Sequence, residues 1–266
     1  MDFSNIKLIV SDMDGTLLNN KGEVSEHFFE LFKKLKEKNI TFCAASGRQF
    51  YSIKQKLSSI KNEIYVIAEN GGITMQADKI LNTYTLPLAT IKKIVTEVRK
   101  IKKAEIVICG KKRAYIESNN ENFIEFFKEF YVEYEKVEDL LEVSQDDFFK
   151  IAIYHPKEAE DYIYPFTKVF KDELQVKVSG EHWVDISSME THKGNALLKL
   201  QNLLKIDATN TAVFGDYNND LEMLKLADFS FAMANAHPNV KNTAKYSTKS
   251  NDENGVEYII EQILNS

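Results

Sequence analysis

Two aspartates one residue apart, Asp12 and Asp14, directly follow the apolar run Leu8–Val10. Such a run predicts a buried strand, and a carboxylate at its end is costly unless it is paired or coordinates a metal ion. Gly15 comes next, and a glycine permits a sharp turn and lets backbone N–H groups approach an anion. The combination predicts a metal-assisted nucleophile that acts on a phosphate. The alternative, from these residues alone, is an ordinary acidic turn after a strand.

A second acidic loop occurs late in the chain. The apolar run Ala212–Phe214 precedes Gly215, and the loop then carries Asp216, Asn219 and Asp220 before a helical stretch begins. A calcium-binding loop is the alternative, but the spacing lacks the terminal glutamate that such a loop uses. We therefore expect a second strand to end in a second set of carboxylates.

Two further features lie between these acidic loops. Ser46 and Gly47 follow the apolar run Ile40–Ala45, and Lys193 opens a helical stretch. Taken alone, the serine and glycine are typical of a helix cap, and the lysine of a solvated surface residue. Taken together with the carboxylates, they supply the hydroxyl, backbone donor and cation that phosphoryl transfer requires.

The order of these motifs, DxDGTL, then SGR, then KG, then GDxxND, spans residues 12 to 220. It resembles the haloacid dehalogenase (HAD) superfamily, and more narrowly its Cof-type sugar-phosphatase branch, which carries a C2B-type cap. The resemblance implies that Asp12 attacks phosphorus and that Asp14 protonates the leaving oxygen and then activates water. If the chain stays extended through this pair, both side chains lie on one side of the strand.

The resemblance also implies a Mg²⁺ cofactor. Its protein ligands are then the Asp12 carboxylate, the Asp14 backbone carbonyl and the Asp216 carboxylate. Asp220 and Asn219 do not bind the metal ion directly but hold metal-bound waters or the phosphate. The oxygens of the transferring group are held by three further groups, which are Ser46, the Gly47 amide and Lys193.

The chain alternates strand-like and helix-like segments, which predicts an α/β fold with a Rossmann-like parallel sheet. Strands are expected at 6–10, 40–45 and 64–68. A helix capped by Ser25 is expected to bury the apolar face formed by Phe28, Leu31, Phe32 and Leu35. In such sheets ligands bind at the carboxyl ends of the strands, where the strand-borne motifs fall.

The long gap between Ser46 and Lys193 leaves room for a domain. We expect residues 1–82 and 189–266 to form the catalytic core, and residues 83–188 to form an α+β cap that determines substrate specificity, with hinges at 83–86 and 187–190. The expected cap helices and strands are, in chain order, a helix over 90–103, strands over 105–108 and 113–117, a helix over 122–131, a strand over 148–154, a helix over 158–170, and strands over 175–178 and 183–186.

Composition narrows the function classes. The chain has 266 residues, 44% of them hydrophobic, and a formal charge of −6, which argues against a general nucleic-acid-binding protein. Cys43 and Cys109 lie in apolar runs without metal-ligand spacing, so we expect both to be buried, reduced and consistent with a cytoplasmic protein. Neither a secretory leader nor a membrane-spanning stretch is expected. We expect a monomer or weak dimer.

The expected function is Mg²⁺-dependent hydrolysis of small phosphorylated metabolites, with sugar phosphates favoured, through an aspartyl-phosphate. A hexose-phosphate phosphomutase is the alternative within the same chemistry. The expected cap has many lysines but only Arg99 and Arg113, without an arginine cluster for a distal phosphate. A non-catalytic regulatory module on the same fold is a further alternative. The five histidines do not cluster, and we expect His182 to pack beside Trp183 rather than contact substrate.

Overall fold

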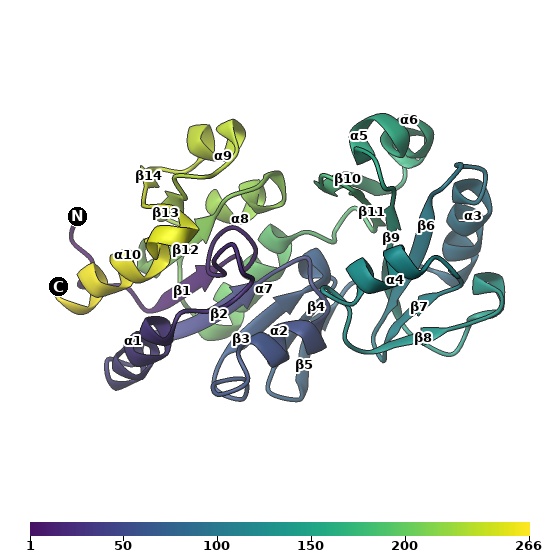
Figure 1. Cartoon of the computed structure of the whole chain (residues 1–266). Helices are drawn as coiled ribbons and strands as arrows, with labels where there is room; N and C mark the ends of the chain where they lie inside the picture. Colours follow the sequence, from purple (N-terminus) through teal and green to yellow (C-terminus); the bar gives the residue numbers. More distant parts are fainter. The chain divides into compact units, whose positions relative to one another are not determined.

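The computed structural model describes residues 1–266, which form two compact units (Figure 1). The first unit comprises three segments, Met1–Ser46, Ile53–Asn82 and His192–Ser266. The second comprises Gly47–Ser52 and Thr83–Thr191. Each unit is built around its own sheet.

The first unit contains an eight-stranded sheet in the order β14-β13-β12-β1-β2-β3-β4-β5. Its strands are β1 (Leu8–Ser11), β2 (Thr41–Ala45), β3 (Tyr65–Ala68), β4 (Ile73–Gln76), β5 (Lys79–Thr83), β12 (Thr211–Gly215), β13 (Phe229–Ala232) and β14 (Tyr246–Ser247). The pairs from β14 through β3 are parallel, and β4 pairs antiparallel with β3. The predicted α/β class with a parallel sheet is confirmed.

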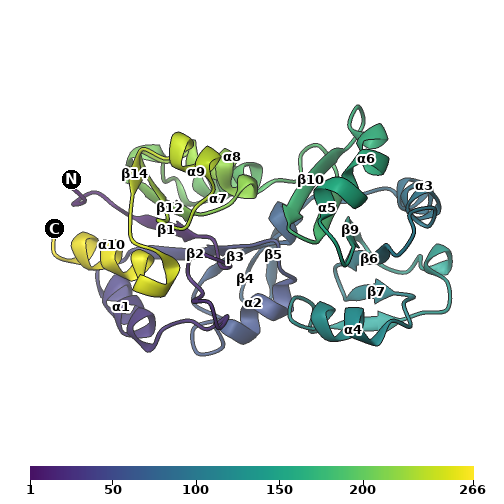
Figure 2. The ribbon, with the colours of Figure 1, turned by 45° about the horizontal axis from the view of Figure 1, so that its top comes forward.

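Helices cover both faces of this sheet. Figure 2 shows α1 and α10 on one face and α7 and α8 on the other. The helices with residues in this unit are α1 (Glu26–Glu37), α2 (Phe50–Lys56), α7 (Lys193–Leu204), α8 (Leu221–Leu224), α9 (Pro238–Thr243) and α10 (Gly255–Leu264). Short 3₁₀ turns are η1 (Glu69–Gly71), η4 (Ala208–Asn210), η5 (Asn218–Asp220) and η6 (Asn251–Glu253).

Helix α1 forms as its sequence predicts. The Ser25 hydroxyl accepts a hydrogen bond from the Phe28 backbone N–H at 3.0 Å, which satisfies one of the free donors at the helix start. The apolar stripe of the helix is fully buried, and the Phe28 ring lies 5.0 Å from that of Phe42 on β2. This packing fixes α1 against the strand that leads to Ser46.

The second unit is an α+β structure. Its six-stranded sheet has the order β10-β11-β9-β6-β7-β8, in which only the β7–β8 pair is parallel. The strands are β6 (Glu105–Gly110), β7 (Ala114–Ile116), β8 (Tyr134–Lys136), β9 (Phe148–Tyr154), β10 (Gln175–Gly180) and β11 (Trp183–Ser187). The helices are α3 (Leu88–Val98), α4 (Glu121–Phe127), α5 (Ala159–Tyr162) and α6 (Tyr164–Thr167), with 3₁₀ turns η2 (Leu140–Glu142) and η3 (Lys168–Phe170).

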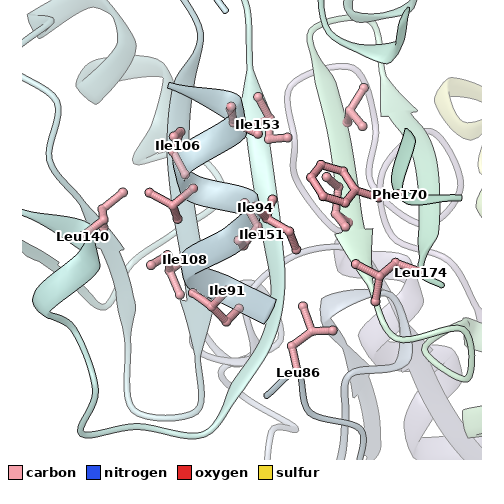
Figure 3. Packing of buried hydrophobic residues seen from close by; sticks show 14 of the residues in the cluster. Leu86, Ile91, Ile94, Ile106, Ile108, Leu140, Ile151, Ile153, Phe170 and Leu174 are labelled. Atoms are coloured by element: carbon pink, nitrogen blue, oxygen red, sulfur yellow. The ribbon is translucent and has the colours of Figure 1, made fainter. Parts of the chain in front are cut away.

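Isoleucines dominate the core on the α3 side of this sheet. Ile91 and Ile94 of α3 pack with isoleucines of β6 and β9, and Phe170 belongs to the same cluster (Figure 3). Because side chains alternate along a strand, Lys150 and Tyr154 of β9 belong to the opposite face of the sheet. Tyr154 there packs in a second cluster with residues of α4.

The structure corrects several predicted boundaries. The expected helix over 158–170 is broken into α5, α6 and η3. Pro165 lies near the start of α6, and a proline has no N–H to continue a preceding helix. The helices expected over 90–103 and 122–131 end earlier, at Val98 and Phe127. Strands β4, β5, β8, β13 and β14 were not predicted, because each has at most five residues and gives too short a pattern.

The division into units also differs from the prediction at two places. Gly47–Ser52 groups with the second unit, which ends at Thr191 rather than at 188. The Gln49 side chain explains the grouping of Gly47–Ser52. Its Oε1 accepts hydrogen bonds from the backbone N–H groups of Val132 and Glu133, and its Nε2 donates to the Glu133 carbonyl. Cys43 and Cys109 are both buried and form no disulfide, as expected.

A buried carboxyl between α10 and the start of α1 yields a pH-dependent prediction. Burial raises the pKa of Glu257, and its carboxylate accepts a hydrogen bond from Ser25 Oγ at 2.6 Å. Because folding disfavours the ionised form, the free energy of unfolding falls as pH rises from the ordinary carboxyl range through the raised pKa. Glu257→Gln keeps an acceptor for Ser25 and removes the charge. We expect the variant to gain melting temperature over the wild type at pH 7, and the gain to disappear near pH 4.

Differential scanning calorimetry at the two pH values measures this difference. Glu37→Gln, at an exposed position on α1, is the matched control and should change little at either pH. A gain that is equal at pH 4 and pH 7 contradicts the assignment.

Candidate active site

The predicted motifs meet at the carboxyl edge of the parallel strands in the first unit. Ser11 at the end of β1 is in register with Ala44 of β2 on one side and Phe214 of β12 on the other. Asp12, Ser46 and Asp216 follow these three strands directly, so their loops emerge side by side. The sheet register therefore brings together residues that are about 200 positions apart in the sequence.

A buried lysine forms the centre of this edge. Lys193 Nζ lies 2.5 Å from Asp12 Oδ1 and 2.7 Å from Asp220 Oδ1, and its side chain has no exposed surface. The lysine is the first residue of α7, whose start is capped by the His192 ring accepting from Asn195 N–H. The sequence-based alternative of a solvated surface lysine is therefore wrong.

Asp220 organises the second acidic loop. Its Oδ2 accepts hydrogen bonds from the backbone N–H groups of Asp216 and Tyr217, at 2.9 and 3.2 Å, while its Oδ1 accepts from Lys193. Both carboxylate oxygens are thus used within the protein. Asp216 is held from another side by Thr16, whose hydroxyl donates to Asp216 Oδ1 at 3.2 Å.

The site concentrates negative charge. One carboxylate oxygen from each of Asp12, Asp216 and Asp220 lies within 4.8 Å of the others. Burial, opposed by Lys193 and reinforced by Asp220 and Asp216, raises the pKa of Asp12 well above its usual range. Burial and the nearby Asp220 carboxylate raise the pKa of Asp216 to about 7. Three carboxylates beside one ammonium leave an excess of two negative charges when all are ionised, and this donor set suits a divalent, oxygen-preferring cation.

The same carboxylates keep the lysine charged. Burial alone lowers the pKa of Lys193, but the carboxylates of Asp12 and Asp220 outweigh that effect and raise it. The lysine is therefore a fixed positive charge at the centre of the site.

The first acidic pair is not part of the strand. Strand β1 ends at Ser11, and the chain then turns, with Leu18 N–H donating to the Met13 carbonyl at 2.8 Å. The condition for Asp12 and Asp14 to share one side of a strand is therefore not met. The turn is tight because Gly15 adopts a φ of +71°, and a Cβ there would lie 2.3 Å from Asp216 Oδ2. Glycine is required by both conformation and space.

The remaining predicted residues lie in loops at the same strand ends. Ser46 is buried, and its N–H donates to the Ile67 carbonyl of β3. Asn219 donates from Nδ2 to Asn70 Oδ1 at 3.0 Å. Gly47, bonded to Ser46, belongs to the second unit, where its carbonyl accepts from Lys150 Nζ at 3.0 Å. The structure brings Asp12, Asp216, Asp220 and Lys193 into direct contact or close proximity, and the phosphate-binding roles of the others stay predictions.

Sequence reasoning missed two residues of this edge. Thr16 lies within the DxDGT motif, so its place beside the carboxylates had a signal in the sequence. Asn70 follows β3 in the turn Glu69–Gly71, which belongs to none of the motifs described from the sequence. His182 packs among aromatic rings, 6.1 Å from Phe126, in line with the expected packing role.

A model of the haloacid dehalogenase-like hydrolases matches residues 9–260. A phosphatase of Escherichia coli K12, the 5-amino-6-(5-phospho-D-ribitylamino)uracil phosphatase YbjI, is 33% identical over 261 residues, covering 97% of this chain and 96% of the relative. The Bacillus subtilis phosphatase YwtE, of the same named activity, is 26% identical over 97% of this chain and 98% of its own.

Solved structures agree with this fold. SMU.1108c from Streptococcus mutans superposes with a TM-score of 0.91 at 32% identity, covering 98% of this chain and all of that one. The subclass IIB sugar phosphatase BT4131 shares the fold, with a TM-score of 0.82 at 19% identity over 96% of this chain and 98% of that one.

The chain belongs to the haloacid dehalogenase-like hydrolases, in their Cof-type branch. It is accordingly a phosphatase of that type, a phosphoric monoester hydrolase whose substrates are small phosphorylated molecules. Phosphatases of this superfamily generally use a divalent metal, and the aspartate cluster supplies suitable ligands. None of its helices has the length and apolar character needed to cross a bilayer.

The buried lysine gives a prediction about stability. Lys193→Met preserves volume but leaves the carboxylates of Asp12 and Asp220 without their cation. Breaking a buried ion pair on one side costs about 3–5 kcal/mol, so we expect a loss of that size in the free energy of unfolding without divalent cations. Urea unfolding with EDTA present measures it.

Lys225→Met, at an exposed lysine just after α8, is the matched control and should stay within about 0.5 kcal/mol of the wild type. A loss below about 1 kcal/mol for Lys193→Met would mean that the lysine does not balance the carboxylates.

Proposed function

We propose that the protein is a Mg²⁺-dependent phosphatase that hydrolyses small phosphorylated metabolites through a phosphoryl group carried on Asp12. The observation that supports this most strongly is the cluster of three aspartates around one buried lysine at the ends of parallel strands. A structural ion-pair network would have no need for a second and third carboxylate beyond the one that the lysine balances.

In the proposed reaction, a carboxylate oxygen of Asp12 attacks phosphorus, and the bond from phosphorus to the leaving oxygen breaks. Asp14 donates a proton to that leaving oxygen and later accepts a proton from the water that attacks the phosphoryl group on Asp12. The second attack breaks the bond to Asp12 and releases orthophosphate. Lys193, Ser46 and the Gly47 amide stabilise the oxygens of the transferring group.

The residues present fit a magnesium ion. Its protein ligands would be the Asp12 carboxylate, the Asp14 backbone carbonyl and the Asp216 carboxylate. When bound, Mg²⁺ neutralises charge on the phosphate and brings the two anions together. Asp220 is better suited to orienting the site than to binding the ion, because both of its oxygens already accept hydrogen bonds within the protein.

We further propose that the second unit selects the leaving group. Residues Gly47–Ser52 continue directly from Ser46 and pack within the second unit, so that unit is tied by the chain itself to the phosphate-binding loop. Arg48, two residues after Ser46, places its guanidinium 4.8 Å from the centre of the Phe130 ring. Two residues span at most about 7 Å of chain, so the backbone of Arg48 stays close to that of Ser46.

A cluster of aromatic rings in the second unit favours a substrate with a flat ring over a simple sugar phosphate. The rings of Trp183 and Tyr154, on adjacent strands, lie 5.3 Å apart, and Phe126 and Phe130 lie 6.2 and 6.0 Å from Trp183. All four side chains are half-buried, and they adjoin Arg48 through Phe130. Grouped, partly exposed aromatic rings are typical of ligand sites. The phosphorylated ribitylaminouracil named for YbjI and YwtE combines such a ring with a sugar-alcohol phosphate.

Asp12→Asn tests the nucleophile. The substitution removes the attacking oxygen but also removes a buried negative charge, so we expect turnover of acetyl phosphate to fall by several orders of magnitude while the melting temperature is maintained or rises. Asp172→Asn, at an exposed position of the second unit, is the control and should keep full activity. Retention of more than about a tenth of the wild-type activity by Asp12→Asn excludes it as the nucleophile.

Metal removal tests the cofactor. We expect activity to disappear in EDTA, to return with Mg²⁺, and to be inhibited by Ca²⁺, whose larger coordination number and longer bonds would misplace Asp12 relative to phosphorus. Steady-state rates in each condition measure this. Full turnover in the presence of chelator is incompatible with the proposed mechanism.

Trp183→Leu distinguishes the two substrate classes. We expect kcat/KM for ring-bearing phosphates (the ribitylaminouracil phosphate, flavin mononucleotide or pyridoxal phosphate) to fall about tenfold or more, in line with the loss of one stacking contact. Acetyl phosphate, which has no ring, should be unaffected. Phe166→Leu, at an exposed ring on α6, is the control. A wild-type enzyme that prefers hexose phosphates, with Trp183→Leu unchanged, would favour the sugar-phosphate alternative.

A further inference from the structure

The segment Glu69–Gly71, which follows β3, has an unusual backbone. Glu69, Asn70 and Gly71 have φ values of 52°, 54° and 100°, so three successive residues occupy the left-handed region. Asparagine tolerates this region better than most residues, but glutamate does not. All three are buried. A strained segment of this kind persists only where its surroundings hold it, and such segments gather at functional sites.

The surroundings of this segment are the loops of the active site. The Asn70 N–H donates to the Ser46 carbonyl at 3.0 Å, and Asn70 Oδ1 accepts from Asn219 Nδ2 at 3.0 Å. Gly71 lies against the start of α7, since a Cβ there would be 2.6 Å from the His192 carbonyl oxygen and 3.2 Å from the Lys193 nitrogen. The segment therefore touches three loops that carry proposed phosphate-binding residues.

We propose that Asn70 is a positioning residue for the phosphate site, an inference that rests on the proposed function. Its backbone N–H holds the Ser46 loop, and its side-chain oxygen holds the amide of Asn219. Because the Asn70 oxygen can only accept, the contact fixes which end of the Asn219 amide is the nitrogen. The second N–H and the carbonyl oxygen of Asn219 are then presented in one orientation instead of two related by a flip of the amide.

The conformation of Asn70 allows a sharp test. Asn70→Gly keeps a residue that adopts positive φ and keeps the backbone N–H to Ser46, but it removes the acceptor for Asn219. Asn39→Gly is a matched control, because Asn39 likewise has a positive φ, of 56°, and is exposed beyond the end of α1. The two variants make the same chemical change at the same backbone conformation, and only one of them is beside the site.

We expect Asn70→Gly to weaken orthophosphate binding and to lower kcat/KM for acetyl phosphate, each by about three- to tenfold, as for the loss of one hydrogen bond. Its melting temperature should follow that of Asn39→Gly. Titration calorimetry with orthophosphate in the presence of Mg²⁺ measures binding directly. In an Asn219→Ala background, Asn70→Gly should have little further effect, because the contact is already absent.

Unchanged orthophosphate affinity and kcat/KM in Asn70→Gly, or full additivity with Asn219→Ala, would overturn the inference. If Asn70→Gly fails to fold, hydrogen exchange of the Asn219 side-chain amide in the wild type decides: slowed exchange supports the contact, and exchange at the rate of a free amide overturns it. Hydrolysis that survives Asp12→Asn would contradict the proposed function instead. An Asp12-dependent enzyme that is insensitive to Asn70→Gly contradicts only this inference.

Discussion

The rest of the site depends on one buried ammonium, that of Lys193. It lies between Asp12 and Asp220, which come from opposite ends of the sequence, and it joins the first acidic loop to the second. Without a cation at this point, burying these carboxylates would be prohibitive. Lys193 balances only part of the negative charge of the three carboxylates. Burial and the remaining repulsion between the carboxylates raise the pKa values of Asp12 and Asp216. We propose that a divalent cation neutralises this remaining repulsion.

The acidic residues around Lys193 make different contacts. Both carboxylate oxygens of Asp220 accept hydrogen bonds, one from Lys193 and the other from the backbone N–H groups of Asp216 and Tyr217. These bonds stabilise the second acidic loop. Asp216 is held by that loop and by the Thr16 hydroxyl, and its carboxylate lies close to those of Asp12 and Asp220. Asp12 faces the lysine with its Oδ1. Asn70 makes neutral hydrogen bonds to the Ser46 carbonyl and to the Asn219 side chain, and we propose that these bonds orient both residues.

Much of this arrangement was predictable, because apolar strands followed directly by acidic, hydroxyl or glycine residues identify the carboxyl edge of a parallel sheet. The register of β1 with β2 and β12 follows from that pattern. What the sequence could not reveal depends on non-local contacts. The grouping of Gly47–Ser52 with the second unit rests on hydrogen bonds between Gln49 and residues 132 and 133. The hydrogen bonds of Asn70 to Ser46 and Asn219 join segments that are far apart in the sequence. The break between α5 and α6 lies beside Pro165, which a pattern of apolar residues does not take into account.

We propose that the aspartate cluster is a divalent cation site held together by Lys193. Titration calorimetry of Mg²⁺ into the metal-free protein, in buffers of different ionisation enthalpy, tests it most directly. Since the pKa of Asp216 is about 7 and a ligand must be deprotonated, we predict that binding releases protons near neutral pH and that affinity rises from pH 6 to pH 8. Asp216→Asn should reduce the proton release and remove most of the affinity. Absence of Mg²⁺ binding, or binding that is indifferent to pH and to Asp216→Asn, would contradict the account.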